Sequence, residues 1–151
     1  MLTDFDETRA AAFTAEHPDI DLRPAEAKYL EEPRGKWRGR AGYVARPRTT
    51  DDVAAIVRFA GTSGFGLVPY GGGTGLVAGQ VAPAGPKPLV VSLEKMARVR
   101  AVYPDEMSLI VEAGATLETL HTVAEDAGLL FPLSYASKGT ATIGAGLAVN
   151  S

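Results

Sequence analysis

The pattern of apolar and polar positions first becomes regular at Tyr43. Tyr43–Ala45 is predicted as a short strand that ends before Pro47. Thr49 or Thr50 then caps a helix, and four residues at helical spacing form its buried face: Val53, Ile56, Val57 and Ala60. Gly66–Tyr70 is predicted as a second strand. A strand, a helix and a strand in this order form a βαβ unit, whose two strands should be parallel.

A second style of pattern follows after Pro88. Three short β-type runs, Leu89–Leu93, Ala97–Val102 and Leu109–Ala113, are separated by turns and predict an antiparallel meander. Thr116 is expected to cap a second helix whose apolar face includes Leu117, Leu120 and Ala124, and Gly128 is expected to end it. The remainder of the chain, Leu129 to Ser151, is predicted as turns followed by a Gly/Ala-rich stretch.

The N-terminal residues are expected to form a lead-in to this domain. Thr3 and Asp6 look like a capping signal for a short helix that ends near Glu16. Residues 17–40 are polar and contain several prolines and glycines, so they are interpreted as an arm packed on a domain. We therefore divide the chain into a helix and arm over 1–40 and one α+β domain over 41–151.

Composition excludes several classes of function. The net charge of −3 leaves no basic surface for nucleic acid. The chain has no cysteine, and its two histidines, His17 and His121, lie far apart, so we expect no metal site. His121 is interpreted as a half-buried structural residue and His17 as a solvated one. The N-terminus is acidic, without the basic and apolar segments of a signal peptide, which predicts a cytoplasmic protein.

The strongest candidate site is the loop Gly71–Gly75, which reads Gly-Gly-Gly-Thr-Gly directly after a predicted strand. Glycine accepts positive φ angles and leaves no Cβ between the backbone and a ligand, so successive N–H groups can converge on an anion. Thr74 adds a hydroxyl donor. The alternative is a loop in which the glycines only allow a turn.

Two common nucleotide-binding motifs are considered and rejected. Gly73–Ala78 satisfies the Gly-x-Gly-x-x-Gly/Ala pattern of dinucleotide-binding folds, and Glu94 lies where a ribose-binding acid is expected. That motif requires a helix to begin at the loop, whereas here Gly79, Pro83, Gly85, Pro86 and Pro88 follow. The chain also lacks the Gly-x-x-x-x-Gly-Lys-Ser/Thr sequence of P-loop enzymes.

A second cluster of small and hydroxyl residues extends from Pro132 to Asn150. Ser134, Ser137, Thr140 and Thr142 offer hydroxyl groups beside glycines that allow close approach of the backbone. Taken alone, this cluster could equally be a Ser/Thr-capped loop entering a tight turn. Together, the two clusters suggest a long ligand that is bound by two segments.

The motifs resemble those of the FAD-binding domain of the vanillyl-alcohol oxidase and p-cresol methylhydroxylase (PCMH-type) superfamily. Within it, the resemblance is closest to D-2-hydroxyacid dehydrogenases of the glycolate oxidase, D-lactate and D-2-hydroxyglutarate type. It rests on these segments: Tyr29-Leu30 and Trp37–Gly39 in the arm, Pro47–Val53, the loop Pro69–Leu76, Val111–Gly114 with Leu117, Phe131–Leu133, Lys138–Thr140, Ile143-Gly144, and Ala148 with Asn150.

The resemblance implies a PCMH-type fold in which a small βαβ subdomain is followed by an antiparallel-sheet subdomain, with FAD between them. It implies that this chain is the N-terminal part of that fold. The residues implied to bind FAD are Pro69, Gly71, Gly72, Gly73, Thr74, Gly75, Leu76, Pro132, Ser134, Ser137, Gly139, Thr140, Thr142, Ile143, Gly144 and Asn150. The first loop lacks the His or Cys of covalent-flavin branches, so non-covalent FAD is expected.

The implied reaction is the oxidation of a D-2-hydroxy acid to the 2-oxo acid by hydride transfer to FAD. In this family the substrate and catalytic residues come from later regions, so no catalytic residue is expected within 1–151. Two alternatives stay open: a non-catalytic flavin- or nucleotide-binding fragment, and the UDP-N-acetylenolpyruvylglucosamine reductase branch of the superfamily. A homo-oligomer also stays open, and the sequence does not indicate the electron acceptor.

Overall fold

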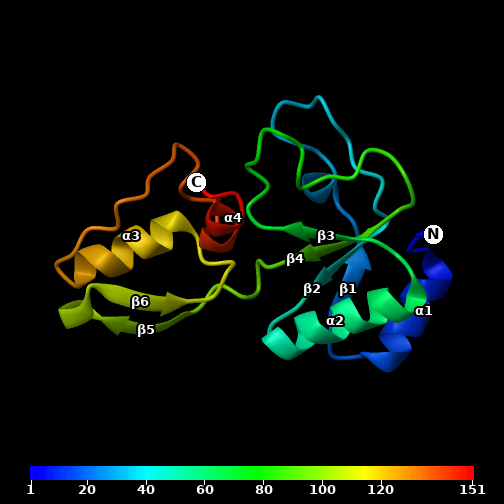
Figure 1. Cartoon of the computed structure of the whole chain (residues 1–151), viewed down its shortest axis with the longest axis horizontal. Helices are drawn as coiled ribbons and strands as arrows, with labels where there is room; N and C mark the ends of the chain where they lie inside the picture. Colours follow the sequence, from blue (N-terminus) through cyan, green and yellow to red (C-terminus); the bar gives the residue numbers. More distant parts are fainter.

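The computed structural model describes all 151 residues as two units that lie side by side (Figure 1). The first unit contains a four-stranded sheet with the order β1-β2-β4-β3. Its strands are β1 (Asp21–Pro24), β2 (Tyr43–Arg46), β3 (Leu67–Tyr70) and β4 (Leu89–Ser92). The second unit contains an antiparallel pair, β5 (Val99–Tyr103) and β6 (Ser108–Val111), which the short helix η2 (Pro104–Glu106) connects.

Three strands of the first sheet are parallel. β4 pairs with β2 on one side and with β3 on the other, so the predicted βαβ unit has parallel strands with a third strand between them. β1 pairs with β2 in the antiparallel direction and forms one edge. The carboxyl ends of β2, β3 and β4 therefore lie at one edge of the sheet, the edge that faces the second unit (Figure 1).

The prediction that Leu89–Leu93 belongs to an antiparallel meander is wrong. All four residues of β4 are buried, because helices cover one face of the sheet and the arm covers the other. A strand buried on both faces has a continuous apolar run, which is what Leu89-Val90-Val91 provides. β5 and β6, in contrast, alternate between partly buried and exposed positions and are antiparallel as predicted.

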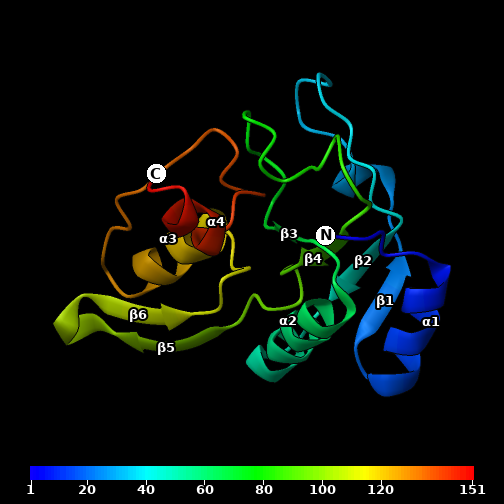
Figure 2. The ribbon, with the colours of Figure 1, turned by 45° about the vertical axis from the view of Figure 1, so that its right-hand side comes forward.

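Two helices cover one face of the sheet: α1 (Glu7–Glu16) and α2 (Thr50–Ser63) (Figure 2). Phe13 of α1 and Ile56 of α2 are fully buried against Leu89 of the central strand. Thr49 is the N-cap of α2 and forms a reciprocal capping box with Asp52, and Gly64 ends the helix in the left-handed conformation. Asp6 rather than Thr3 caps α1, because its side chain accepts the Arg9 N–H.

The arm covers the opposite face of the sheet. It contains β1 and the short helix η1 (Ala27–Tyr29), neither of which was predicted. Tyr29 is buried beside Val44, Tyr70 and Val90, and its ring meets the Tyr70 ring edge-on at 5.1 Å between centroids. His17, expected to be solvated, packs instead against the rings of Phe13 and Phe59, and 22% of its side chain is exposed.

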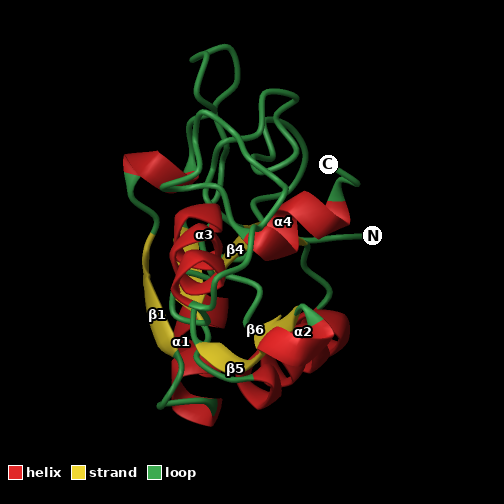
Figure 3. Ribbon diagram, turned by 90° about the vertical axis from the view of Figure 1, so that its left-hand side faces the viewer, coloured by secondary structure: helices red, strands yellow, loops and turns green.

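The second unit ends in two helices, α3 (Leu117–Asp126) and α4 (Ile143–Ala148). Thr116 caps α3 and Gly128 follows it with φ +71°, both as predicted. α4 was not predicted. It lies between α3 and the loop that follows β3, and the longest loops of both units gather at this end of the molecule (Figures 1 and 3).

Candidate functional site

The two glycine-containing segments meet in the structure. A methyl group on Gly72 would lie 1.7 Å from the carbonyl oxygen of Thr140, and one on Gly71 would lie 2.5 Å from Thr142 Oγ1. Both distances are too short for any residue other than glycine unless the two segments separate. The loop after β3 and the start of α4 therefore pack backbone to backbone, and this close approach depends on Gly71 and Gly72.

The shape of the first loop is fixed from below by Tyr70. Gly73 has φ +70°, and a Cβ there would lie 2.1 Å from the Tyr70 hydroxyl group. That hydroxyl donates to the carbonyl of Lys28 in the arm at 2.7 Å. Burial raises the pKa of Tyr70, so the hydroxyl stays protonated and keeps this bond at neutral pH. The arm thus holds the last residue of β3 directly under the loop.

The loop presents a continuous series of free donors. None of the backbone N–H groups from Gly71 to Leu76 donates to a backbone carbonyl. The only side chain that donates to this loop is Gln80, and it bonds to carbonyl groups, those of Gly73 and Gly75. A run of uncommitted N–H groups in a glycine-rich turn is the arrangement that binds phosphate groups.

The second segment contributes fewer free donors than its sequence suggests. The N–H groups of Ile143 and Gly144 donate to the carbonyls of Ala115 and Ala113, both at 2.9 Å, and so anchor α4 to the turn before α3. The Thr140 hydroxyl donates to Ser137. Thr142 differs, because its Oγ1 is buried, has no partner and lies against Gly71. A buried hydroxyl without a partner is costly, so Thr142 is the side chain of this segment best suited to a ligand.

The remaining predicted residues are spread around this meeting point. Pro132 and Ser134 line a hollow beside α3 together with His121, whose Nε2 lies 2.8 Å from the carbonyl oxygen of Leu133. His121 therefore has the structural contact that was expected. Four further positions are exposed or partly so: Pro69, Ser137, Gly139 and Asn150. Pro69 lies in β3 just before the first loop, and no hydrogen bond joins Ser137, Gly139 or Asn150 to that loop.

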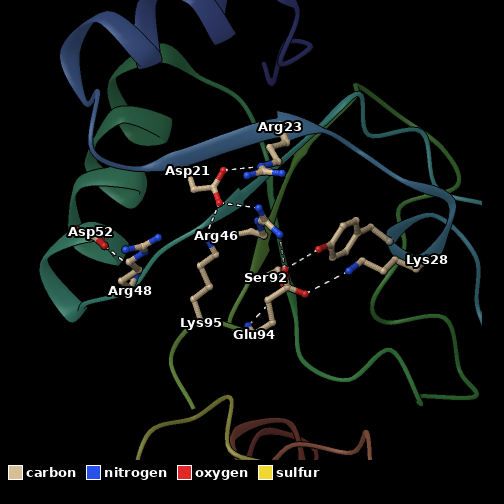
Figure 4. A network of polar contacts seen from close by, with 10 residues as sticks. Asp21, Arg23, Lys28, Arg46, Arg48, Asp52, Ser92, Glu94 and Lys95 are labelled. Atoms are coloured by element: carbon tan, nitrogen blue, oxygen red, sulfur yellow. Dashed lines mark hydrogen bonds and ion pairs between the residues drawn. The ribbon is translucent and has the colours of Figure 1, made fainter. Parts of the chain in front are cut away.

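A network of charged groups lies at the carboxyl edge of the first sheet (Figure 4). Arg46 at the end of β2 contacts Asp21 and Glu94, and Glu94 also accepts hydrogen bonds from Tyr29 and Lys28. Burial alone would raise the pKa of Glu94, but these donors outweigh it and lower the pKa. Glu94 is thus an ionised partner of the arm and not a free ribose-binding acid. No helix follows the glycine loop either, so the structure lacks both features of the dinucleotide-binding motif.

A buried carboxylate, that of Glu112, stabilises the support of α4. Glu112 has 1% of its side chain exposed and accepts two hydrogen bonds from the Arg98 guanidinium, at 2.8 and 3.0 Å, and a third from Arg100. These bonds lower the pKa of Glu112 to about 2, and those from the Arg98 side chain have the largest effect. The charged pair fixes the turn at residues 112–115, which carries the carbonyls that hold Ile143 and Gly144.

Sequence reasoning missed three residues of this region. Gln80 was not singled out, although its side chain touches two loop carbonyls. Tyr70 was placed at the end of a strand and in the loop Pro69–Leu76 without a role of its own, and Tyr135, whose buried hydroxyl has no partner, was not singled out. The motifs give none of these three side chains a role, so only their surroundings in the fold reveal their contacts.

A family model described as FAD binding domain matches residues 41–151. The chain belongs to this family. Its curated relatives include D-2-hydroxyglutarate dehydrogenase of Xanthomonas citri pv. viticola, 36% identical over 76% of this chain and 24% of the relative. The mitochondrial D-2-hydroxyglutarate dehydrogenase of Bos taurus is 33% identical over 80% of this chain and 23% of the relative. The chain thus spans about a quarter of the length of these relatives.

Solved structures share the fold of this FAD-binding domain. A structure of alkyldihydroxyacetonephosphate synthase matches with a TM-score of 0.81 at 17% identity, over 99% of this chain and 30% of the other. The BBE-like 1 variant D396N of Physcomitrella patens matches with a TM-score of 0.71 at 21% identity, over 90% of this chain and 29% of the other. The α+β, PCMH-type fold and the family resemblance predicted from the motifs are confirmed. None of the helices has both the length and the apolar run that crossing a membrane requires.

Proposed function

We propose that this chain binds FAD non-covalently where its two glycine-containing segments meet, and that it serves a flavin-dependent oxidation of a D-2-hydroxy acid. The observation that carries the proposal is the contact of Gly71 and Gly72 with Thr140–Thr142, beside a loop of uncommitted N–H groups, in a chain of the FAD-binding-domain family. The loop Gly71–Leu76 would hold the pyrophosphate, and Thr142 Oγ1 would donate to the same cofactor. The other residues proposed from the motifs, Pro69, Pro132, Ser134, Ser137, Gly139, Thr140, Ile143, Gly144 and Asn150, would surround it.

FAD and the protein would have separate roles in this reaction. Bound FAD supplies a two-electron acceptor, while the protein binds it, orients it and excludes water from it. Oxidation would remove a hydride from the α-carbon of the hydroxy acid and a proton from its hydroxyl group, giving the 2-oxo acid. The names of the curated relatives support the hydroxy-acid class over the reductase branch. A cytoplasmic location stays a prediction, because some of these relatives are named as mitochondrial.

Flavin binding tests the proposal directly. The purified chain is titrated with FAD while flavin fluorescence and the visible spectrum are recorded. Gly72→Ala should weaken FAD binding at least about tenfold, because its Cβ would force the loop away from Thr140. Gly79→Ala is the matched control, because the same methyl group meets nothing within 4 Å there, and its FAD affinity should equal that of the wild type. Equal FAD affinity in both variants would contradict the site.

Two further measurements test the finer parts of the proposal. Acid precipitation of the FAD complex should leave the flavin in the supernatant, whereas flavin that stays with the pellet would show a covalent bond. For the substrate class, the full-length protein that carries this domain is assayed by dye reduction with D-2-hydroxyglutarate, D-lactate and glycolate. The L-enantiomers of the first two serve as controls, and activity only with the L-forms would contradict the proposal.

A further inference from the structure

Gln80 lies beneath the glycine loop and donates to it twice. Its side-chain Nε2 is 2.7 Å from the carbonyl oxygen of Gly75 and 3.3 Å from that of Gly73. Gln80 itself is 9% exposed, so the two hydrogen bonds are partly shielded from water on the side of the amide donor. A tight turn places it there, because the Val81 N–H donates to the Ala78 carbonyl at 3.1 Å and Ala78 adopts φ +62°.

These two bonds also set the direction of two N–H groups. In a trans peptide the C=O and the following N–H point in opposite directions across one plane, and the chain has no cis peptide bond. The carbonyls of Gly73 and Gly75 share their planes with the N–H groups of Thr74 and Leu76. Since Gln80 holds both carbonyls on its side of the loop, both N–H groups point to the opposite side. Neither donates to a backbone carbonyl.

We propose that Gln80 is a positioning residue that orients the Thr74 and Leu76 N–H groups toward the oxygens of a bound diphosphate. This inference rests on the proposed FAD site. The residue does not touch the ligand, and acts by holding two peptide planes in the orientation that binding requires. Without its amide, the carbonyls of Gly73 and Gly75 lose their side-chain donor, and each plane can rotate to place a carbonyl oxygen against the phosphate.

Two variants separate this role from a general effect on stability. Gln80→Met keeps the length of the side chain but removes the donor, and should weaken FAD binding about tenfold, as expected for two lost hydrogen bonds. Gln80→Glu has no donor while its carboxyl group is ionised, so it should bind FAD weakly at pH 8. At pH 5, where a buried glutamate becomes protonated, its O–H can donate again and FAD binding should partly recover.

The controls isolate the orientation of the loop. Wild type is titrated with FAD at both pH values, since the diphosphate stays ionised across this range, and Val77→Ala, at a position that is 91% exposed, should bind like wild type. Circular dichroism verifies that each variant is folded. In ¹H–¹⁵N spectra, FAD should shift the Thr74 and Leu76 amide signals strongly in wild type and much less in Gln80→Met.

The outcomes separate the two claims. If wild type does not bind FAD, the proposed function falls, and the role of Gln80 falls with it. If wild type binds FAD and Gln80→Met binds it equally well, only the role of Gln80 is overturned. A Gln80→Glu variant whose FAD affinity, relative to wild type, is the same at pH 5 and pH 8 would also overturn it, because a merely structural defect would not be rescued by a proton.

Discussion

At the scale of single residues, the surroundings of two tyrosine hydroxyl groups differ. The Tyr29 hydroxyl donates to Glu94 at 2.9 Å, whereas the Tyr135 hydroxyl is buried without a partner near Gly146. Burying a polar group without a hydrogen bond costs about 1–3 kcal/mol, and a buried group that has a hydrogen-bond partner avoids that cost. The same substitution should therefore have different effects at the two positions.

Tyr135→Phe should leave the free energy of unfolding unchanged or raise it by up to about 1 kcal/mol, because it removes only an unsatisfied group. Tyr29→Phe should lower it by about 1–2 kcal/mol, because Glu94 loses a donor. Urea denaturation of the two variants without added flavin measures both effects. If Tyr135→Phe destabilises the protein as much as Tyr29→Phe, the Tyr135 hydroxyl has a partner in solution.

At the scale of elements, α2 was predictable because its signals are local. Thr49, Asp52 and Gly64 determine where it begins and ends, whatever packs against it. α4 was not, because two glycines give it a low helix propensity, and its first N–H groups bond to Ala115 and Ala113 of a distant turn. β4 was assigned to the wrong sheet, since a buried run of apolar residues does not reveal its neighbours.

Gly61 tests the local origin of α2. It lies inside the helix, and an added methyl group would meet nothing within 4 Å. Gly61→Ala should therefore raise the free energy of unfolding by about 0.5–1 kcal/mol. Gly64→Ala is the contrasting variant, because Gly64 has φ +72°, and should lower it by about 1 kcal/mol. Chemical denaturation of both variants gives the two changes, and equal signs would contradict this account of the helix.

At the scale of the whole molecule, the sequence predicted that two glycine-containing segments act together, and the structure brings Gly71 and Gly72 against Thr140 and Thr142. It did not predict how the first loop is supported. That support comes from Tyr70, Gln80 and the arm, through contacts between side chains and distant backbone groups that leave no repeated pattern in a sequence.

The charged network predicts how the molecule responds to acid. Burial alone would raise the pKa of Asp21, but bonds from Lys95, Arg23 and Arg46 outweigh it and lower the pKa well below its usual range. Because the folded pKa is lower than the unfolded one, this contribution to stability is complete above about pH 4 and is lost as the pH falls further.

Asp21→Asn should therefore lower the free energy of unfolding by roughly 3 kcal/mol at pH 7, by leaving Arg46 and Lys95 short of a partner. The loss should shrink below pH 4, where wild type loses the same interaction. Urea denaturation at pH 7, 5 and 3 measures this dependence. Asp19→Asn is the control, since Asp19 is exposed and close in sequence, and a loss of equal size there would contradict the account.

The central position of β4 has a consequence for synthesis on the ribosome. β2, α2 and β3 emerge first, but β2 and β3 do not pair with each other, because each pairs in the parallel direction only with β4. A nascent chain that ends before Leu89 therefore has no parallel sheet, and the glycine loop at the end of β3 has no fixed base. A fixed base for this loop should therefore appear only once Ser92 has left the exit tunnel, and the proposed FAD site is complete only after Thr140 and Thr142 have followed.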